Sequence, residues 1–211
     1  MNVYIDGENF RHRLVGALLG ERLIGSSHEA FHFDVAAIMS IVLGHKPEAI
    51  NYYTSRVQQP KFPIPEEMTR KIDSIHEVNR RWVSDLTNQG INVIKAGYLK
   101  VRDSTRCIHC GEKTLILQEK GVDVRLATDM VLAAAQEHIT HIVLLSSDAD
   151  MIPAIDHVRQ SGTKVTYLCF EEELNHAVSA VVDETLSYTR QNIIDTYQSN
   201  QHPANEGKVE L

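Results

Sequence analysis

Short apolar runs alternate with segments of helical spacing along most of this 211-residue chain, and this alternation is the feature that most restricts its fold. The predicted strands are residues 2–5, 48–55, 91–101, 141–147 and 164–170. The predicted helices are residues 35–43, 65–89, 122–138, 149–162, 172–181 and 185–196. Strands that alternate with helices form a mostly parallel sheet with helices on both faces. We therefore predict an α/β fold with three layers, α/β/α.

The chain is long enough for one domain with a single substantial core, which we expect at residues 1–196. Residues 197–211 are polar, and we expect a disordered tail there. No run of 18 apolar residues occurs, so no membrane partner is expected. The N-terminus lacks the basic and apolar regions of a secretory signal, and the expected location is cytoplasmic.

The formal net charge of the chain is −7 at pH 7. Proteins that hold nucleic acid by charge alone are basic overall. The charge therefore argues against a protein that coats DNA or RNA, but it allows an enzyme that handles nucleic acid at one acidic, metal-loaded site.

Two of the predicted strands run directly into aspartates. The first strand, in "NVYIDGENF", leads to Asp6, and the fourth, in "HIVLLSSDADMIPAI", leads to Asp148 and Asp150. In an open parallel sheet the working site lies outside the carboxyl ends of the strands. If these two strands are neighbours, their carboxylates converge at that edge.

Each acidic candidate also has an ordinary structural explanation. Asp123 stands at the start of a predicted helix, where a carboxylate is favoured, Asp150 fits a helix cap, and Asp6 fits a turn. Together with Asp148, however, these carboxylates repel one another unless a cation lies between them. Oxygen ligands without convergent His or Cys select Mg²⁺ or Mn²⁺, and such a site activates water for phosphodiester hydrolysis. We predict that all four aspartates are catalytic and bind the metal.

Polar and basic residues beside the acids are candidates for binding the substrate. They are Asn9, Arg11, Arg13, Ser146 and Ser147. Phosphate contacts from the arginines would position a nucleic-acid strand without reading its bases. Solvated surface charge is the alternative explanation for either arginine.

Three segments, in this order and at this spacing, resemble the NYN domain and in particular its LabA-like branch: "YIDGEN", "KGVDVRLATDM" and "LLSSDADMIPAI". The resemblance covers the chain from residue 1 to about residue 184. It implies the PIN-like nuclease fold, a parallel sheet of order 3-2-1-4-5, and metal-dependent cleavage of RNA. The residues that it places on the acidic metal site of the family are Asp6, Asn9, Asp123 and Asp148, with Asp150 and Asp129 as further members.

The two acids of "KGVDVRLATDM" compete for one place. Asp123 and Asp129 are six residues apart, which corresponds to about 240° around an α-helix. They cannot both point into one site, and we favour Asp123.

The segment "CIHCGEK" departs most from the family pattern. We expect residues 103–118 to form a small hairpin insertion that carries Cys107 and Cys110. A C-x₂-C turn is half of a structural zinc site, whose other ligands would come from histidines or from a second subunit. The alternative is a reduced hairpin tip without metal.

Three functions are open at this point. The first is a divalent-metal-dependent ribonuclease, and the second is a non-catalytic RNA-binding or regulatory protein that acts through a partner. The third is a phosphatase of the haloacid dehalogenase type, whose D-x-D motif resembles "SDAD", but Ile152 stands where that family wants Thr or Val. RNA is the expected partner, and a homodimer or a protein partner is left open.

Overall fold

The computed structural model describes residues 1–30, 32–104, 106 and 109–201. Within these residues, seven strands form one sheet in the order β4-β3-β2-β1-β5-β6-β7. The strands are β1 (Asn2–Asp6), β2 (Ala49–Val57), β3 (Asn92–Asp103), β4 (Leu115–Lys120), β5 (His141–Leu145), β6 (Lys164–Phe170) and β7 (Glu184–Tyr188). The α-helices are α1 (Gly7–Gly20), α2 (Val35–Leu43), α3 (Glu66–Asn88), α4 (Val122–Ala134), α5 (Ile152–Gln160), α6 (His176–Ser179) and α7 (Arg190–Gln201). Within the described residues, no helix is both long enough and apolar enough to cross a membrane.

The sheet is mixed and larger than the one predicted. Among the described residues, β4 pairs with β3 in the antiparallel direction, and the other five pairs of neighbouring strands are parallel. The prediction of a mostly parallel sheet of order 3-2-1-4-5 is therefore corrected to a mixed sheet of seven strands. The five expected strands keep that order but form only the interior, and the antiparallel strand β4 and the parallel strand β7 occupy the edges. The sequence pattern assigns β4 to a small insertion and β7 to a helix, whereas both are strands of the main sheet.

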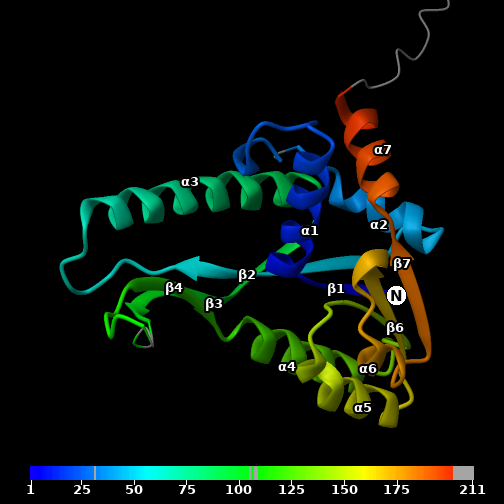
Figure 1. Cartoon of the computed structure of the whole chain (residues 1–211). Helices are drawn as coiled ribbons and strands as arrows, with labels where there is room; N and C mark the ends of the chain where they lie inside the picture. The colour runs from blue at the N-terminus through cyan, green and yellow to red at the C-terminus, as the bar shows by residue number, and fades with distance from the viewer. Residues whose placement is uncertain (31, 105, 107–108, 202–211) are drawn as a thin grey trace, which may run out of the picture.

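Helices cover both faces of the sheet, as the sequence predicts (Figure 1). The helices α1, α2, α3 and α7 lie on one face, and α4, α5 and α6 lie on the other. A separate apolar cluster fills each side of the sheet. Central strand β1 contributes to both clusters, because Val3 and Ile5 belong to the first and Tyr4 to the second. Burial on both faces explains why this strand reads as a continuous apolar run.

Helix α1 is the element that sequence patterning does not reveal. Its buried residues Phe10, Leu14 and Leu18 recur at helical spacing and pack into the first cluster. Three glycines in the segment "GENFRHRLVGALLG" weaken its helical signal. The turn expected at Asp6 is in fact the N-cap of α1, so the chain passes from strand to helix without a loop.

Gly97 allows β3 to approach the start of α4. A Cβ at Gly97 would lie 2.3 Å from the carbonyl oxygen of Lys120 and 2.9 Å from the amide nitrogen of Val122. No side chain fits into this space, so the bare backbone of Gly97 sets the distance between β3 and the turn before α4. Asp123 is the second residue of that helix.

The C-terminal boundary also differs from the prediction. The end of β7 lies within residues 185–196, which the sequence pattern assigns to a helix, and α7 continues to Gln201, so residues 197–201 of the expected tail are helical. Packing explains the extension, because Ile193 and Tyr197 are four residues apart on α7 and both are buried in the first cluster. Residues 202–211 lie outside the described residues.

The hairpin of β3 and β4 belongs to the main sheet and is not a small insertion. The two strands pair from Tyr98↔Lys120 to Asp103↔Leu115. Cys107 lies outside the described residues, and Cys110 is an exposed free cysteine. The structure therefore gives no support to a zinc site at this cysteine pair.

We expect Gly7→Ala to destabilise the fold. A Cβ at Gly7 would lie 2.3 Å from Tyr52 Cε1 and 2.4 Å from the carbonyl oxygen of Tyr53, so α1 or β2 has to shift. Overpacking of this kind lowers the free energy of unfolding by about 1–3 kcal/mol, which urea denaturation measures. Gly16→Ala in the same helix is the control, because its Cβ meets no atom within 4 Å, and it should stabilise the protein by about 0.5–1 kcal/mol. Equal stability of the two variants would contradict this explanation.

Candidate active site at the carboxyl ends of β1 and β5

Asp6 and Asp148 lie at one edge of the sheet because β1 and β5 are neighbours. The two strands pair in parallel, so their carboxyl ends lie side by side. Asp6 is the last residue of β1, and Asp148 follows β5 after Ser146 and Ser147. The hydroxyl of Ser146 donates to Asp6 Oδ2 at 3.4 Å and links the two strand ends.

Both carboxylates also cap the helical segments that follow them. Asp6 Oδ1 accepts a hydrogen bond from the amide of Asn9 at 3.2 Å, at the start of α1. Asp148 Oδ1 accepts one from the amide of Asp150 at 2.9 Å, at the start of the 3₁₀ turn Ala149–Met151. The cap that the sequence suggests for Asp150 is thus provided by Asp148. Capping holds each carboxylate in a fixed direction, which suits a structural role and a functional role alike.

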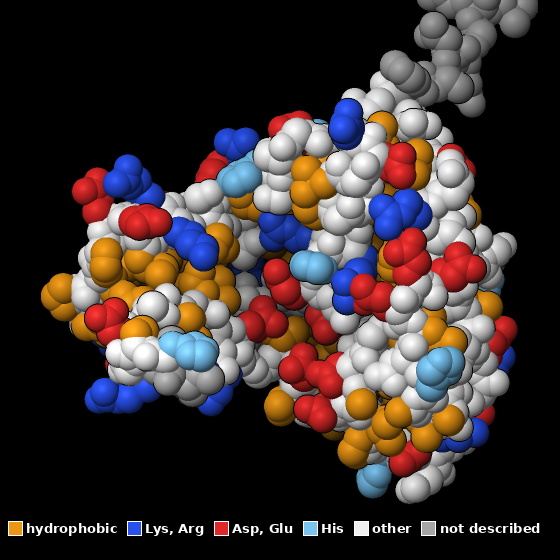
Figure 2. Space-filling view, viewed as in Figure 1, with side chains coloured by type: hydrophobic (Ala, Val, Ile, Leu, Met, Phe, Trp, Pro, Cys, Tyr) orange, Lys and Arg blue, Asp and Glu red, His pale blue; other side chains and the backbone are white. Residues whose placement is uncertain are grey.

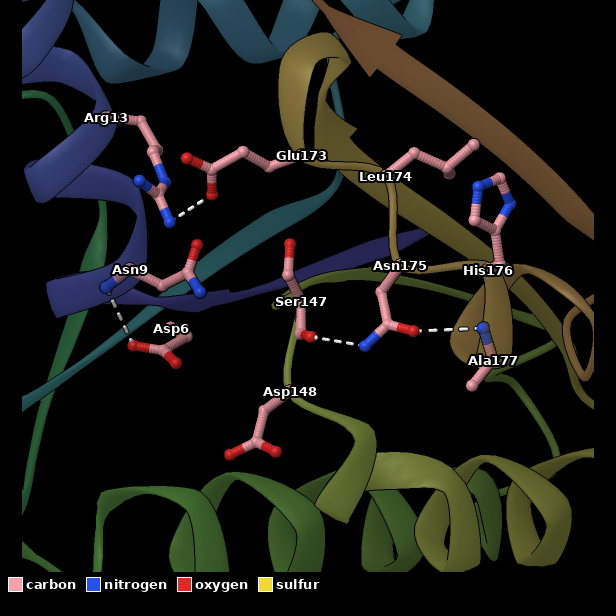
Figure 3. Close-up of a pocket in the computed structure, with 10 residues that line it drawn as sticks. All are labelled: Asp6, Asn9, Arg13, Ser147, Asp148, Glu173, Leu174, Asn175, His176 and Ala177. Carbon is pink, nitrogen blue, oxygen red and sulfur yellow. Dashed lines mark hydrogen bonds and ion pairs between the residues drawn. The ribbon is translucent and has the colours of Figure 1, made fainter.

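A cleft of about 780 Å³ opens beside these two acids. Its wall comes from the start of α1, the loop after β5 and the segment between β6 and α6. Figure 3 shows Asp6, Asn9 and Asp148 around the same opening. The lining residues are Asp6, Asn9, Arg13, Ser147, Asp148, Glu173, Leu174, Asn175, His176 and Ala177.

Polar contacts fix the loop that carries Asp148. Asn175 Nδ2 donates to the carbonyl oxygen of Ser147 at 2.8 Å, and Asn175 Oδ1 accepts from the amide of Ala177 at 2.9 Å (Figure 3). The hydroxyl of Tyr167 donates to Ser147 Oγ at 3.0 Å. Both the backbone and the side chain of Ser147 are therefore engaged within the protein, and the loop is tied to α6 and β6.

The pKa values of the acids at this edge reflect burial and mutual repulsion. Burial raises the pKa of the Asp6 carboxyl and the charge of Asp123 adds to this, while the hydrogen bond from the Asn9 amide lowers it. Burial also raises the pKa of Asp123, and the charges of Asp148 and Asp150 raise it further. The four acids that the sequence selects therefore share one electrostatic environment.

Glu119 belongs to the same acidic group. Burial raises the pKa of its carboxyl, while a hydrogen bond with Ser55 lowers it. The charges of Glu8, Asp6 and Asp123 raise this pKa further. Figure 2 shows the acidic side chains that gather around a hollow at the centre of this face.

Sequence reasoning does not select Glu119, Glu173 and Asn175. Glu119 comes from β4, and only the pairing of β4 with the main sheet brings it to this edge. Glu173 and Asn175 follow β6, whose carboxyl end lies beside that of β5. No motif marks these three residues, but the correct strand order would have pointed to them.

Among the described residues, the predicted catalytic aspartates have no cationic partner. None of Asp6, Asp123, Asp148 and Asp150 forms an ion pair within the described residues. Arg13 lines the cleft but is paired with Glu173 (Figure 3). The cluster thus keeps an uncompensated negative charge, which suits a divalent cation held by oxygen ligands.

In the described part of the chain, no three His, Cys, Asp or Glu side chains form a group that could hold one metal ion. Within these residues the four predicted ligands are therefore not preassembled as a closed ligand set, and their joint binding of a metal stays a prediction. Their chemistry fits Mg²⁺ or Mn²⁺. Their arrangement fits an ion that keeps several water ligands and contacts one or two carboxylates.

Two residues expected near the acids have other contacts. Asp129 forms an ion pair with Arg125 at 2.8 Å and accepts a hydrogen bond from the hydroxyl of Tyr53 at 3.0 Å, so it links α4 to β2. Arg11 donates to Asn79 Oδ1 at 2.8 Å and lines a second cleft on a different face of α1.

We expect Asp6→Asn to stabilise the metal-free protein at neutral pH. Because burial raises the pKa of Asp6 in the folded state, ionisation of this carboxyl opposes folding as the pH rises from the ordinary aspartate pKa, about 3.9, through the raised value. Asparagine keeps the N-cap and carries no charge. In EDTA, the free energy of unfolding should exceed the wild-type value at pH 7, and this advantage should vanish below the ordinary aspartate pKa.

Asp34→Asn supplies the control, since it makes the same exchange at the N-cap of α2. An advantage of Asp6→Asn that does not change with pH would contradict the electrostatic explanation.

The sequence profile of the NYN domain matches residues 1–189, which confirms the resemblance to the NYN domain but not to its LabA-like branch. The fold is similar to the crystal structure of a protein of unknown function from Vibrio parahaemolyticus, with a TM-score of 0.51, 16% sequence identity, and coverage of 88% of this chain and 90% of that chain. No match was found among curated proteins. At this identity the structural likeness shows the fold alone, whereas the profile covers most of the chain. The chain belongs to the NYN domain family, which is part of the PIN-like nuclease superfamily.

Proposed function

We propose that this protein is a divalent-metal-dependent ribonuclease of the LabA-like branch, which hydrolyses RNA phosphodiester bonds at the cleft beside β1 and β5. Membership of the PIN-like nuclease superfamily supports a nuclease in general. The observation that carries the proposal is the position of Asp6 and Asp148 at neighbouring strand ends beside a cleft, where neither has a cationic partner in the described part of the chain. The three segments that resemble the LabA-like branch supply the four predicted catalytic acids, Asp6, Asp123, Asp148 and Asp150.

Asp6 and Asp148 are the side chains that would hold the metal, with Asp123 and Asp150 in electrostatic range. When bound, Mg²⁺ or Mn²⁺ supplies positive charge to phosphoryl oxygens and lowers the pKa of a water molecule. The chain itself contributes acids whose directions are fixed by caps and whose mutual repulsion favours a cation between them. An ion that contacts one or two carboxylates also leaves ligand positions for a phosphate of the substrate.

The polar residues of the cleft suit a phosphodiester. The side-chain amide of Asn9 offers donors to a phosphate oxygen, and Arg13 offers a guanidinium beside its partner Glu173. Ser146 and Ser147 are engaged within the protein, and we assign them to positioning the acids and not to contact with RNA. The phosphate contacts are thus local, which is compatible with a net charge of −7.

We expect the purified protein to cleave a mixed RNA pool in Mn²⁺ or Mg²⁺ and not in EDTA. Asp148→Asn should reduce cleavage about 100-fold or more, because loss of a metal ligand removes several kcal/mol of transition-state stabilisation. Asp156→Asn is the matched control, since Asp156 is an exposed acid of α5 that does not line the cleft. The same metals should raise the melting temperature of the wild type and much less that of Asp148→Asn.

Other results would change the assignment. Binding of RNA without any cleavage by the wild type would favour the alternative, a non-catalytic RNA-binding or regulatory protein. Turnover of a small phosphomonoester without RNA cleavage would favour phosphatase chemistry. Equal cleavage by Asp148→Asn and the wild type would place the activity elsewhere.

A further inference from the structure

A second cleft, of about 610 Å³, lies between α1, α3 and the hairpin of β3 and β4. Apolar side chains form a continuous part of its walls; of these, Val78 is buried and Val15 packs against the first core cluster. From α1 come Val15 and Leu19, which are four residues apart. The remaining apolar walls are Ile75, Val78, Leu99 and Leu117. Figure 2 shows the hollow in this region, with hydrophobic side chains on one wall and acidic side chains beside it.

One end of this cleft is polar and adjoins the acidic cluster. Glu119 and Ser55 both line the cleft, and their side chains are hydrogen-bonded to each other. Glu119 is in electrostatic range of Asp6 and Asp123. Glu8 of this cleft and Asn9 of the acidic cleft are consecutive residues of α1, so the two clefts adjoin along this helix.

The charge of the cleft argues against a run of backbone phosphates. Arg11 is the only Lys or Arg among its described lining residues, whereas Glu8 and Glu119 contribute two carboxylates. The guanidinium of Arg11 is held in place by its hydrogen bond to Asn79 at 2.8 Å. Apolar walls that end in carboxyl, hydroxyl and amide groups instead match a flat group with apolar faces and a polar edge.

We propose that this cleft receives an unpaired base of single-stranded RNA whose backbone lies at the acidic cleft, an inference that rests on the proposed ribonuclease function. The apolar walls contact the faces of the base, and the polar end with Glu119 and Ser55 meets the amino and ring N–H groups of its edge. The volume lies within the range of about 300–1,000 Å³ found for ligand pockets, and it accommodates the sugar as well. A base that is paired in a duplex cannot enter, so the cleft selects single strands.

Gly16 allows the cleft to be filled without a change in the core. It lies on α1 and lines the cleft, and a Cβ at this position meets no atom within 4 Å. Gly16→Phe places a ring in the cleft, whereas Gly16→Ala changes only the helix propensity. Gly16→Ala is therefore the matched control.

The test is binding of a fluorescent single-stranded oligoribonucleotide in Mg²⁺, measured by anisotropy with both variants in the Asp148→Asn background, where cleavage is suppressed. We expect Gly16→Phe to weaken binding about tenfold or more relative to Gly16→Ala, since it removes the contacts of one base. A duplex of the same sequence should bind both variants equally and more weakly. Equal affinity of the two variants for the single strand, or tighter binding of the duplex, would overturn the proposal.

A second measurement uses the wild-type protein and does not depend on the folding of Gly16→Phe. An oligoribonucleotide that contains 4-thiouridine should crosslink under ultraviolet light to peptides from α1, α3 or β4 that line the cleft. Crosslinks confined to other peptides would overturn the proposal. If the ribonuclease assignment is wrong, metal-dependent cleavage will be absent while binding that depends on the cleft remains. The two failures are therefore distinguishable.

Discussion

Parallel pairing of β1 with β5 is the constraint on which the candidate site depends. These strands are buried on both faces of the sheet, so a slip of one residue would turn apolar side chains out of each core cluster. The fixed register keeps the two carboxyl ends side by side and brings Asp6 and Asp148 together, although they lie far apart in the chain. The same logic extends outward, because β6 and β4 deliver Glu173 and Glu119 to the same edge.

The fold holds these acids against their own repulsion. The pKa values of Asp6, Asp123 and Glu119 are raised, chiefly by burial and then by neighbouring carboxylates. Hydrogen bonds from the amides of Asn9 and Asp150 offset part of this cost at the two strand ends. The acidic cluster thus lowers the local stability of this edge of the sheet, and such a local loss of stability is typical of functional sites.

Sequence patterning foresees the interior of the fold better than its edges. Apolar runs identify the buried strands, and the rotation of a helix is enough to separate Asp123 from Asp129, which the structure places apart. Helix α1 is not predicted because its glycines weaken the periodic signal. Strand β4 is not predicted as part of the main sheet because an edge strand carries few fully buried residues. Glu119 and Asn175 therefore have no local signature, since only the strand order brings them to the site. The ligand set of a metal likewise depends on the ion and on water, which motif spacing does not encode.

A substitution at Gly97 would disturb the acidic site although every acidic residue is kept. The turn before α4 rests against the bare backbone at this position, and Asp123 is the second residue of the helix that begins there. A larger residue would push the helix start outward while all the carboxylates stayed in the sequence. A relative that keeps every acidic residue but has replaced this glycine would therefore lose the arrangement of the acidic edge, and inspection of its acidic residues alone would not reveal the loss.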